Sequence, residues 1–281
     1  MNLLTITEDQ SLGEKFDEYF EEVHSYSIEN VKIDADQDRV TSYVNGRRVG
    51  DYDALFIRPT PKAITFTRLF LESLMESDIE SVIDGTSYYI IAKKPYLFKV
   101  LTEKNIPTPK TFVVSSQKSM SSAQDMLDGE IVCKKFEGFI RKDIMKTDDP
   151  EDIKAFSESL EHGKNYMVVQ EFVEGDVYDC LYIDGDIIST RIKGESWRKS
   201  PRRDECSESY HKPPSDVSEI AKQAANAIGS KFCSIRLVGP RVVDMHMNPD
   251  IERFMKASGK NAIEKVSKML KPDKDENGDS Q

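Results

Sequence analysis

Short apolar runs alternate with amphipathic stretches along the first third of the chain. Runs with strand character occupy residues 3–6, 27–33, 42–44, 53–57 and 81–84. A capping-box pattern predicts a helix that opens at Ser11, with Glu14 three residues on and an apolar stripe reaching Val23. A second helix is predicted from the apolar positions of residues 64–74. This alternation predicts a parallel or mostly parallel sheet covered by helices.

The rest of the chain has a different pattern, in which strands follow one another more closely. A helix over residues 96–104 ends before two prolines, Pro107 and Pro109. Strands are predicted at residues 110–114, 131–134, 167–173, 177–183 and 186–192, and as a hairpin at 232–238 and 241–247. Helices are predicted at residues 124–127, from 149 onward, at 216–228 and at 262–270. The strands between 167 and 192 predict an antiparallel meander, and residues 197–214 predict a long binding loop.

Composition and charge narrow the class of protein. The 281 residues include 39 Lys+Arg and 50 Asp+Glu, which gives a formal net charge of −11. So acidic a chain gains little from counterion release, and we expect no nucleic-acid partner. The N-terminus shows no secretory signal and no apolar run approaches membrane-spanning length, so we expect a cytoplasmic protein without a membrane partner. The four cysteines form no zinc pattern and are expected to be reduced thiols.

Four stretches in one order carry a resemblance to a known family. They are AKKPYLFKVLTEKNIPTPKTF at 92–112, EIVCKKFEG at 130–138, MVVQEFVEGDVYDCLYIDGDII at 167–188 and CSIRLVGPRVVDMHMNPD at 233–250. Together they resemble the RimK-type ligases and glutathione synthetases of the ATP-grasp superfamily. The resemblance covers about residues 92–270, and the preceding segment is similar to the α/β domain that comes before the ATP-grasp fold in that family.

The resemblance implies an α/β architecture of the α+β ATP-grasp type. It places a pre-ATP-grasp α/β domain at residues 1–91 and a two-lobed ATP-grasp domain at 92–270. Within the latter, we expect the smaller lobe at about 110–172 and the C-terminal lobe at about 173–270. Residues 271–281 are polar and are predicted to form a disordered acidic tail.

Two lysines occupy the positions of the family's ATP-contacting lysines. Lys94 begins the first helix of the resemblance, and Lys134 ends an apolar strand. ATP carries roughly four negative charges near neutral pH, and lysines on two separate elements can neutralise much of that charge. Ordinary surface lysines are the alternative for both, although the apolar strand before Lys134 speaks against it there. ATP is the expected cofactor.

Adenine binding needs an apolar slot with backbone groups at one edge, and a strand that runs into a hinge supplies both. The resemblance places Glu171, Phe172 and Val173 at this hinge. A carboxylate just beyond the hinge would bind the ribose hydroxyls. The acidic candidates are Glu174, Asp176 and Asp179. Asp176 fits best by position, and solvated turn acids are the alternative for each.

A metal site is predicted on the last strand of the resemblance. Magnesium needs hard oxygen ligands and shares the nucleotide phosphates with them. Side chains alternate between faces along a strand, so Asp244, His246 and Asn248 are expected to point the same way and to bind Mg²⁺ or Mn²⁺. The family's Glu-x-Asn pattern aligns with Asp244 and His246, or, after a shift of two residues, uses Asn248. Histidine is a softer ligand, more typical of transition metals.

Several arginines replace or extend the family's pattern. Arg236 stands where the family usually has an aspartate, and it could clamp a phosphate or a substrate carboxylate. The loop after Lys134 has one glycine, so either Arg141 and Lys142 replace backbone amides by charge or this loop does not cover phosphate. The basic run after residue 190 contains Arg191, Lys193, Arg198, Lys199, Arg202 and Arg203. By the resemblance, Arg191 and Arg198 are candidates to stabilise the transferring phosphoryl group; a solvated charge run is the alternative.

We therefore expect an ATP-dependent ligase that joins a carboxylate to an amine through an acyl phosphate. The substrates would be small molecules or peptides, and a homo-oligomer is compatible with the sequence. A second hypothesis is a degenerate ATP-grasp protein that binds nucleotide or a partner without turnover, which Arg236 and the glycine-poor loop favour. A kinase-like phosphoryl transfer is the third. The sequence identifies neither the donor nor the acceptor.

Overall fold

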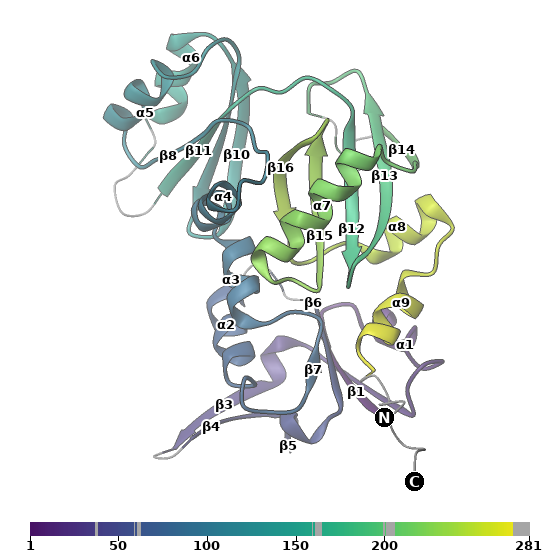
Figure 1. The fold of residues 1–281 in the computed structure, drawn as a ribbon. Coiled ribbons are helices and arrows are strands. Elements are labelled where there is room, and N and C mark those ends of the chain that lie inside the picture. Colours follow the sequence, from purple (N-terminus) through teal and green to yellow (C-terminus); the bar gives the residue numbers. More distant parts are fainter. Residues whose placement is uncertain are drawn as a thin grey trace.

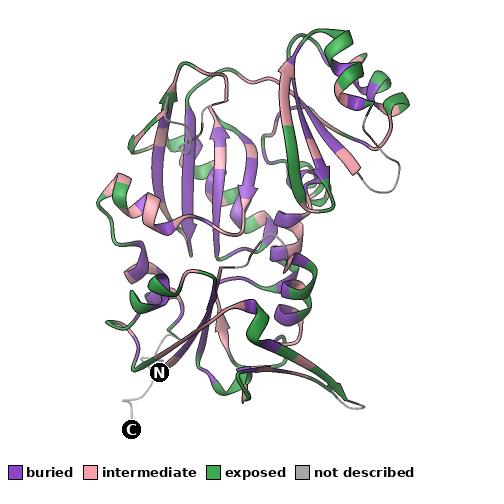
Figure 2. Ribbon diagram, turned by 180° about the vertical axis from the view of Figure 1, so that it is seen from behind, coloured by how far each residue is buried: buried purple, intermediate pink, exposed green. Residues whose placement is uncertain are grey.

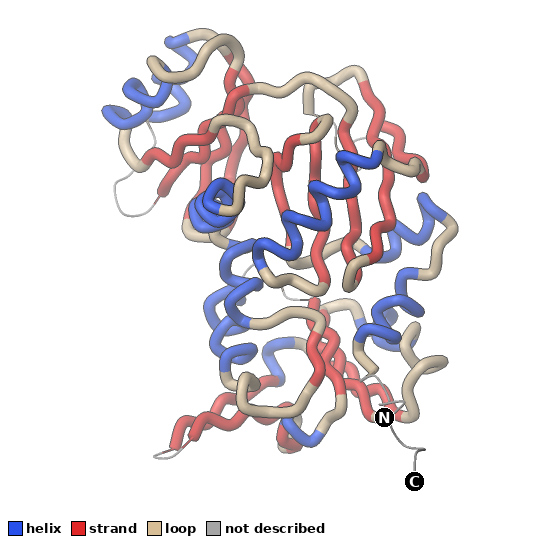
Figure 3. Tube along the Cα trace, in the orientation of Figure 1, coloured by secondary structure: helices blue, strands red, loops and turns tan. Residues whose placement is uncertain are grey.

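The computed structural model describes residues 1–36, 39–58, 60, 63–158, 160, 165–198, 200 and 206–271. The chain builds three sheet-based parts, which we call the N-terminal part, the small lobe and the large lobe (Figure 1). The two lobes lie side by side above the N-terminal part, and helices pack against the sheet of each (Figure 3). Helix α4 (Lys94–Glu103) lies where the three parts meet.

A parallel four-stranded sheet in the order β2-β1-β6-β7 forms the centre of the N-terminal part. Its strands are β1 (Asn2–Thr7), β2 (Glu22–Tyr26), β6 (Ala54–Arg58) and β7 (Glu80–Ser81). The helices of this part are α1 (Gln10–Glu14), α2 (Ile64–Glu72) and α3 (Gly85–Ala92). The predicted parallel sheet covered by helices is confirmed, because every pairing within this sheet is parallel.

A second, antiparallel sheet extends from the N-terminal part as a narrow arm (Figure 1). It consists of β3 (Val31–Asp36), β4 (Arg39–Val44) and β5 (Arg47–Arg48), flanked by the 3₁₀ helices η1 (Ile28–Asn30) and η2 (Val49–Asp51). Asn45 and Gly46 join β4 to β5 with φ angles of 47° and 82°, as a two-residue hairpin turn requires. The strand predicted at 27–33 starts only at Val31, because Ser27 caps η1 instead.

The first predicted helix was wrong in its extent. Helix α1 ends at Glu14, and Val23, which we assigned to its stripe, lies in β2. Ser11 does not cap the helix either, since its hydroxyl donates to the Asp9 carboxylate at 2.7 Å. Helix α3 was not predicted, because its sequence GTSYYIIA is apolar on several sides and lacks an amphipathic stripe.

The small lobe is an antiparallel sheet in the order β10-β9-β11-β8. Its strands are β8 (Thr111–Val114), β9 (Ile131–Glu137), β10 (Ile140–Thr147) and β11 (Asn165–Glu171), and its helices are α5 (Gln117–Gln124) and α6 (Pro150–Ser157). The helix start at Asp149 is confirmed, with Pro150 at the first position. The short helix at 124–127 was wrong, since α5 ends at Gln124. The expected loop at 137–142 is a tight turn that leads into β10.

The large lobe is an antiparallel sheet in the order β14-β13-β12-β15-β16. Its strands are β12 (Val177–Ile183), β13 (Asp186–Gly194), β14 (Cys206–Tyr210), β15 (Phe232–Val238) and β16 (Arg241–His246), and its helices are α7 (Ser215–Ile228), α8 (Ile251–Ser258) and α9 (Ala262–Met269). The prediction of a three-stranded meander was wrong, because β11 belongs to the small lobe. Of its three strands, only β12 and β13 pair with each other. The predicted long loop at 197–214 contains β14.

Helices α7 and α8 cover opposite faces of the large sheet. The Tyr182 hydroxyl donates to Asn226 of α7 at 2.8 Å, whereas Asp179, three residues earlier on β12, accepts from Arg253 of α8 at 3.0 Å. Residues an odd number apart on a strand point to opposite faces. The face that carries Asp179 is therefore the α8 side, and the charged residues described below lie on it.

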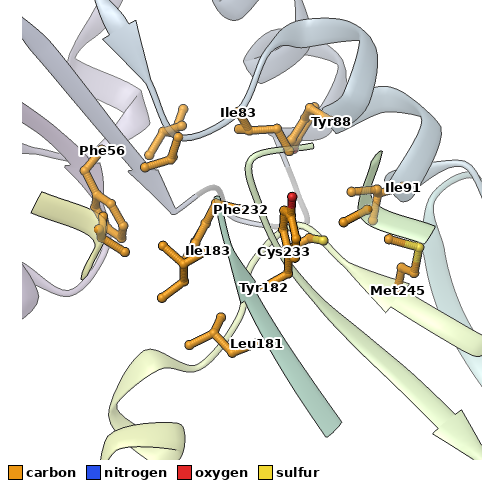
Figure 4. Packing of buried hydrophobic residues seen from close by; sticks show 14 of the residues in the cluster. Phe56, Ile83, Tyr88, Ile91, Leu181, Tyr182, Ile183, Phe232, Cys233 and Met245 are labelled. Carbon is orange, nitrogen blue, oxygen red and sulfur yellow. The ribbon is translucent and has the colours of Figure 1, made fainter. Parts of the chain in front are cut away.

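One continuous hydrophobic core joins the N-terminal part to the large lobe. Phe56 of β6 meets Phe232 of β15 with ring centroids 6.1 Å apart, and Ile183 and Tyr88 lie nearby (Figure 4). The central strands β12 and β15 of the large sheet are buried along most of their length (Figure 2). Much of the small lobe packs around a separate cluster that includes Met167. Phe136 and Val168 on other positions of the small sheet belong instead to the main cluster.

Candidate functional site

A cavity of about 810 Å³ lies between the small lobe and the large lobe. Strands β9, β10 and β11 supply one wall, β15 and β16 supply another, and residues 172–176 and 194–198 complete the lining. Many of the residues singled out from the sequence face this space. They are Lys134, Glu171, Phe172, Val173, Asp176, Arg198, Arg236 and Asp244. Elements from both lobes thus bring together side chains that are more than a hundred residues apart.

Lys134 is a buried lysine at the cavity wall. Its amino group donates to the Gln170 side-chain carbonyl at 2.6 Å and to the Val243 backbone carbonyl at 3.0 Å, so it links β9 to β11 and β16. Burial lowers the pKa of Lys134 to about 8, and three nearby cations add to this effect against the opposing charge of Asp244. Those cations are Arg141, Lys94 and Arg236. An anion in the cavity would favour the protonated, charged form of Lys134.

Lys94 lies directly behind Asp244. Its amino group donates to the Met245 carbonyl at 2.5 Å and forms an ion pair with the Asp244 carboxylate at 2.8 Å. Burial acts to raise the pKa of Asp244, yet Lys94, His246 and Lys134 together outweigh it and hold that pKa well below its usual range. Lys94, Lys134 and Asp244 therefore meet in one place, although Lys94 does not itself line the cavity.

Arg236 also faces the cavity but is anchored on its other side. Its Nε and Nη2 atoms donate to the two carboxylate oxygens of Asp179 at 2.8 and 2.7 Å. Arg253 donates to the same carboxylate and pairs with Glu208. Burial opposes ionisation here, but the Asp179 charge raises the pKa of Arg236 and fixes it as a cation. This network holds one edge of the guanidinium rigidly and leaves the group at the cavity wall.

The link between the lobes carries the predicted adenine contacts. Strand β11 ends at Glu171, whose backbone N–H donates to the Lys110 backbone carbonyl at 3.0 Å. The backbone N–H of Phe172 donates to the Glu130 backbone carbonyl at 2.9 Å. Both N–H groups are thus engaged within the protein. A base could instead use the carbonyl groups of this link or the backbone from Val173 onward.

The predicted ribose contact, Asp176, lines the cavity beyond the link. Its carboxylate accepts a hydrogen bond from Arg191 of β13. Glu174 lines the same stretch, whereas Asp179 is buried beneath Arg236 and Arg253. Of the three acids considered, Asp179 is therefore committed to holding arginines.

Besides Lys94, three other predicted site residues do not line the cavity. Arg191 pairs with Asp176 and stays outside the lining. His246 lies beside Asp244, with Nε2 at 3.6 Å from its Oδ2, and burial together with nearby cations lowers the pKa of the imidazole, so it is neutral near pH 7. Strand β16 ends at His246, not at the predicted Met247, and Asn248 accepts a hydrogen bond from Arg58 of β6 at 2.9 Å. Lys199, Arg202 and Arg203 lie outside the described residues.

These donors do not match a magnesium site built by the protein. Within the described ranges, no three His, Cys, Asp or Glu side chains gather as metal ligands would. Asp244 is already paired with Lys94, and Arg141 Nη1 lies 3.9 Å from its other oxygen. Asn248 is bound by Arg58 beyond the end of the strand. Both predicted oxygen donors thus already have cationic partners, and the set of Asp244, His246 and Asn248 stays a prediction.

Several cavity residues were missed by the sequence reasoning. Strand β10 contributes Ile144 and Lys146, and Arg141, considered there only as part of a loop, lies on the same strand. Trp197, which we placed at the start of a loop, also lines the cavity. The one available signal for β10 was its spacing after Gly138, because a turn after an apolar strand commonly returns as a second strand.

Comparison with known proteins decides the family. A RimK-like ATP-grasp domain matches residues 92–270, well over half of the chain. The chain belongs to the RimK-like ATP-grasp family. The resemblance stated from the sequence and the expected ATP-grasp fold are both confirmed, as is the expectation of an enzyme of the ligase class at the level of the family.

Relatives of this RimK-like protein are ligases. A probable alpha-L-glutamate ligase of Aliivibrio fischeri is 24% identical over 228 residues, which are 78% of this chain and 76% of that protein. A probable alpha-L-glutamate ligase of Psychromonas ingrahamii is 22% identical over 254 residues, 85% of this chain and 82% of that protein.

Solved structures share the fold. The ATP-grasp ligase PsnB complexed with a minimal precursor superposes with a TM-score of 0.74 at 16% identity, covering 96% of this chain and 97% of that one. The D-alanine–D-alanine ligase of Bacillus anthracis complexed with ATP has a TM-score of 0.66 at 14% identity, covering 96% of each chain. Among the residues described for the RimK-like chain, no helix has the length and apolarity needed to cross a membrane.

Proposed function

We propose that this RimK-like protein is an ATP-dependent ligase that joins a carboxylate to an amine through an acyl phosphate. One observation carries the proposal: Lys134 and Asp244 lie at the wall of a single cavity between two lobes, and Lys94 is paired with Asp244 directly behind that wall. That cavity is large enough for a nucleotide and a second substrate, since small-molecule sites are typically about 300–1,000 Å³. Family membership supports the same chemistry in general terms.

The lining suggests how the substrates would be divided. The link from Glu171 to Val173 and the carboxylate of Asp176 are our candidates for the adenosine part. Lys134 and Arg236 are our candidates for the phosphates, and Lys94 would act behind them by fixing Asp244. Burial strengthens each of these charge contacts relative to water, because the local dielectric is lower.

The proposed reaction has two steps. A carboxylate oxygen of the first substrate attacks the γ-phosphorus of ATP, the bond from that phosphorus to the β–γ bridging oxygen breaks, and ADP leaves. The amine nitrogen of the second substrate then attacks the acyl carbon, phosphate leaves with the bonding electrons, and the nitrogen loses a proton. The protein would supply position and positive charge, with Arg236, Arg191 and Arg198 as the predicted phosphoryl-stabilising residues. Of these, Arg236 and Arg198 line the cavity.

The substrate class follows from the relatives. Two of them are named as probable alpha-L-glutamate ligases, and a further PsnB structure is complexed with the precursor peptide PsnA2 and AMPPNP. We propose an amino acid, or a peptide bearing one, as a substrate. Mn²⁺ as a substitute metal, a homo-oligomeric state and a cytoplasmic location remain predictions.

The decisive experiment traps the acyl phosphate. The protein is incubated with ATP, Mg²⁺, hydroxylamine and a panel of carboxylates that includes L-glutamate, L-aspartate and glutamate-ended peptides. Hydroxylamine takes the place of the amine, so a hydroxamate that forms together with ADP identifies the activated carboxylate. The panel is repeated with amines in place of hydroxylamine, and amides are detected by mass spectrometry.

A matched pair of variants shows whether the cavity is responsible. Lys134→Met removes the buried cation, whereas Lys135→Met changes the next residue on β9, whose amino group lies 5.5 Å from the Phe156 ring centroid. We expect hydroxamate formation to fall by at least about a hundredfold in the first variant and to stay near wild type in the second. Binding of ATP without turnover on any substrate pair would favour the degenerate alternative. Equal activity in both variants would contradict the proposed site.

A further inference from the structure

Three charged residues form a row across the large sheet, on the face toward α8. The strand register places Asp179 of β12 opposite Arg236 of β15, and Arg236 opposite Asp244 of β16. Residues directly opposite on neighbouring antiparallel strands share a face. In this row, the guanidinium of Arg236 therefore lies between the carboxylates of Asp179 and Asp244.

Both carboxylates of the row already have cationic partners. Asp179 is bound through both oxygens by Arg236 and also accepts from Arg253 at 3.0 Å. Asp244 is paired with Lys94 at 2.8 Å. A divalent cation that used both acids would have to displace these partners and leave buried arginine or lysine charges unpaired, which is strongly unfavourable.

Positive charge is in excess around Asp244. Lys94, Lys134, Arg141 and Arg236 all act electrostatically on one another or on this carboxylate, and Asp179 is the other acid of the row. Arg236 uses Nε and Nη2 toward Asp179, while a guanidinium has five N–H donors in total. Donors of Arg236 therefore remain for an anion in the cavity that this residue lines.

We propose that this site binds the phosphates of its nucleotide directly on side-chain cations, chiefly Arg236 and Lys134, so that nucleotide affinity depends little on magnesium. Arg236 occupies the middle of the row, between the two acids that could serve a metal as ligands. This inference rests on the proposed function, because it takes the nucleotide site to be this cavity. It concerns binding only, and magnesium carried by the nucleotide can still influence turnover.

Calorimetry on the full chain tests the proposal with ADP and a non-hydrolysable ATP analogue as probes. Each is titrated once with excess Mg²⁺ and once with EDTA. We expect the two Kd values to agree within about threefold. In EDTA, Arg236→Gln should weaken binding by about tenfold or more, Arg236→Lys should retain most of it, and Arg39→Gln at an exposed position of strand β4 should change nothing. Thermal melting checks that each variant is folded.

A further variant serves if Arg236→Gln does not fold. The double variant Asp179→Asn/Arg236→Gln removes both partners of the buried pair, so no unpaired carboxylate is left. Binding that needs Mg²⁺ in the wild type would overturn this inference while leaving the nucleotide site intact. Metal-independent binding that is unchanged in both Arg236→Gln and the double variant would also overturn it. No binding under either condition would instead contradict the proposed function.

Discussion

Lys134 shows how a single residue can be held ready for an anion. Its amino group is buried at the cavity wall, where the cations Arg141, Lys94 and Arg236 lower its pKa and the Asp244 carboxylate raises it. Burial is the main reason that its pKa falls from 10.5 to about 8. A phosphate in the cavity would favour the protonated form and move the pKa back up.

Nucleotide affinity should therefore fall as the pH rises through 8. In the free protein Lys134 loses its proton above that pH, so binding must first restore the proton. Between about pH 7.5 and about pH 9 we expect Kd for ADP to rise by about tenfold. Titrations in buffers of different ionisation enthalpy should show proton uptake at the upper end. Lys134→Arg should flatten the profile; an unchanged Kd in the wild type would show that the protonated amine is not used.

The same shift has a consequence for stability, with a defined sign. Between about pH 8 and pH 10.5 the unfolded chain binds a proton at Lys134 that the folded chain does not hold. The contribution of this residue to the free energy of unfolding therefore increases with pH across that window and is least favourable below it. Holding a charged lysine here lowers stability in exchange for anion binding.

At the scale of elements, the turn between β9 and β10 is attached to the N-terminal part. Phe139 lies 5.8 Å from Tyr89 of α3 between ring centroids, and the Lys93 amino group lies 4.8 Å from the Phe139 ring centroid. Two residues later, Arg141 lines the cavity. The aromatic contact therefore sets the position of a cavity cation.

Phe139→Ala should weaken nucleotide binding without unfolding the protein. An aromatic pair and a cation–π contact each contribute on the order of 1 kcal/mol, so losing both should raise Kd for ADP by on the order of tenfold. Calorimetry measures the affinity, and thermal melting checks the fold. Ile140→Ala is the matched control, because Ile140 is 40% exposed on the same hairpin. Equal affinities for the two variants would contradict this role for the turn.

Elements with a strong local pattern were predictable, and the others depend on distant partners. Helix α7 carries an apolar stripe, and β15 and β16 are joined by a clear turn, so all three were predicted. Strand β10 has a run of exposed charged residues near its start, and its cavity residues Arg141, Ile144 and Lys146 follow no simple alternation. The short helix α8 was also missed, and its Arg253 faces the buried Asp179 instead of solvent.

The candidate site was predictable to a similar degree. Lys134 and Asp244 each stood out locally, as a polar residue in an apolar strand, and the structure brings both to the cavity. The pairing of Arg236 with Asp179 links residues 57 positions apart, and no local pattern indicates it. The end of β16 at His246 depends likewise on tertiary contacts such as that of Asn248 with Arg58. No local pattern indicated that Asn248 of the predicted metal set is bound by Arg58.

At the scale of the whole molecule, the shared core makes the N-terminal part and the large lobe one folding unit. Phe232 is 2% exposed and packs against Phe56 across the boundary. Phe232→Ala should lower the free energy of unfolding by about 3–5 kcal/mol, measured by urea denaturation. Leu69→Ala, at a side chain that is 49% exposed, is the control and should change little.

Hydrogen exchange on the same variant separates two views of the domain organisation. If the core is shared, protection should fall together in β6 and in β15. Loss of protection in β15 alone would show that residues 1–91 form an independent domain, as the predicted boundaries allow. For the same reason, a fragment that begins at residue 92 would expose Phe232 and should not fold well alone.

Trp197 has a practical consequence. It is the one tryptophan in the chain, and it borders the cavity near Arg198. Indole emission responds to the polarity and charge around the ring, so a molecule that enters the cavity should change the protein's intrinsic fluorescence. The unlabelled protein thus contains its own optical reporter, with which candidate donors and acceptors can be screened before any turnover assay exists.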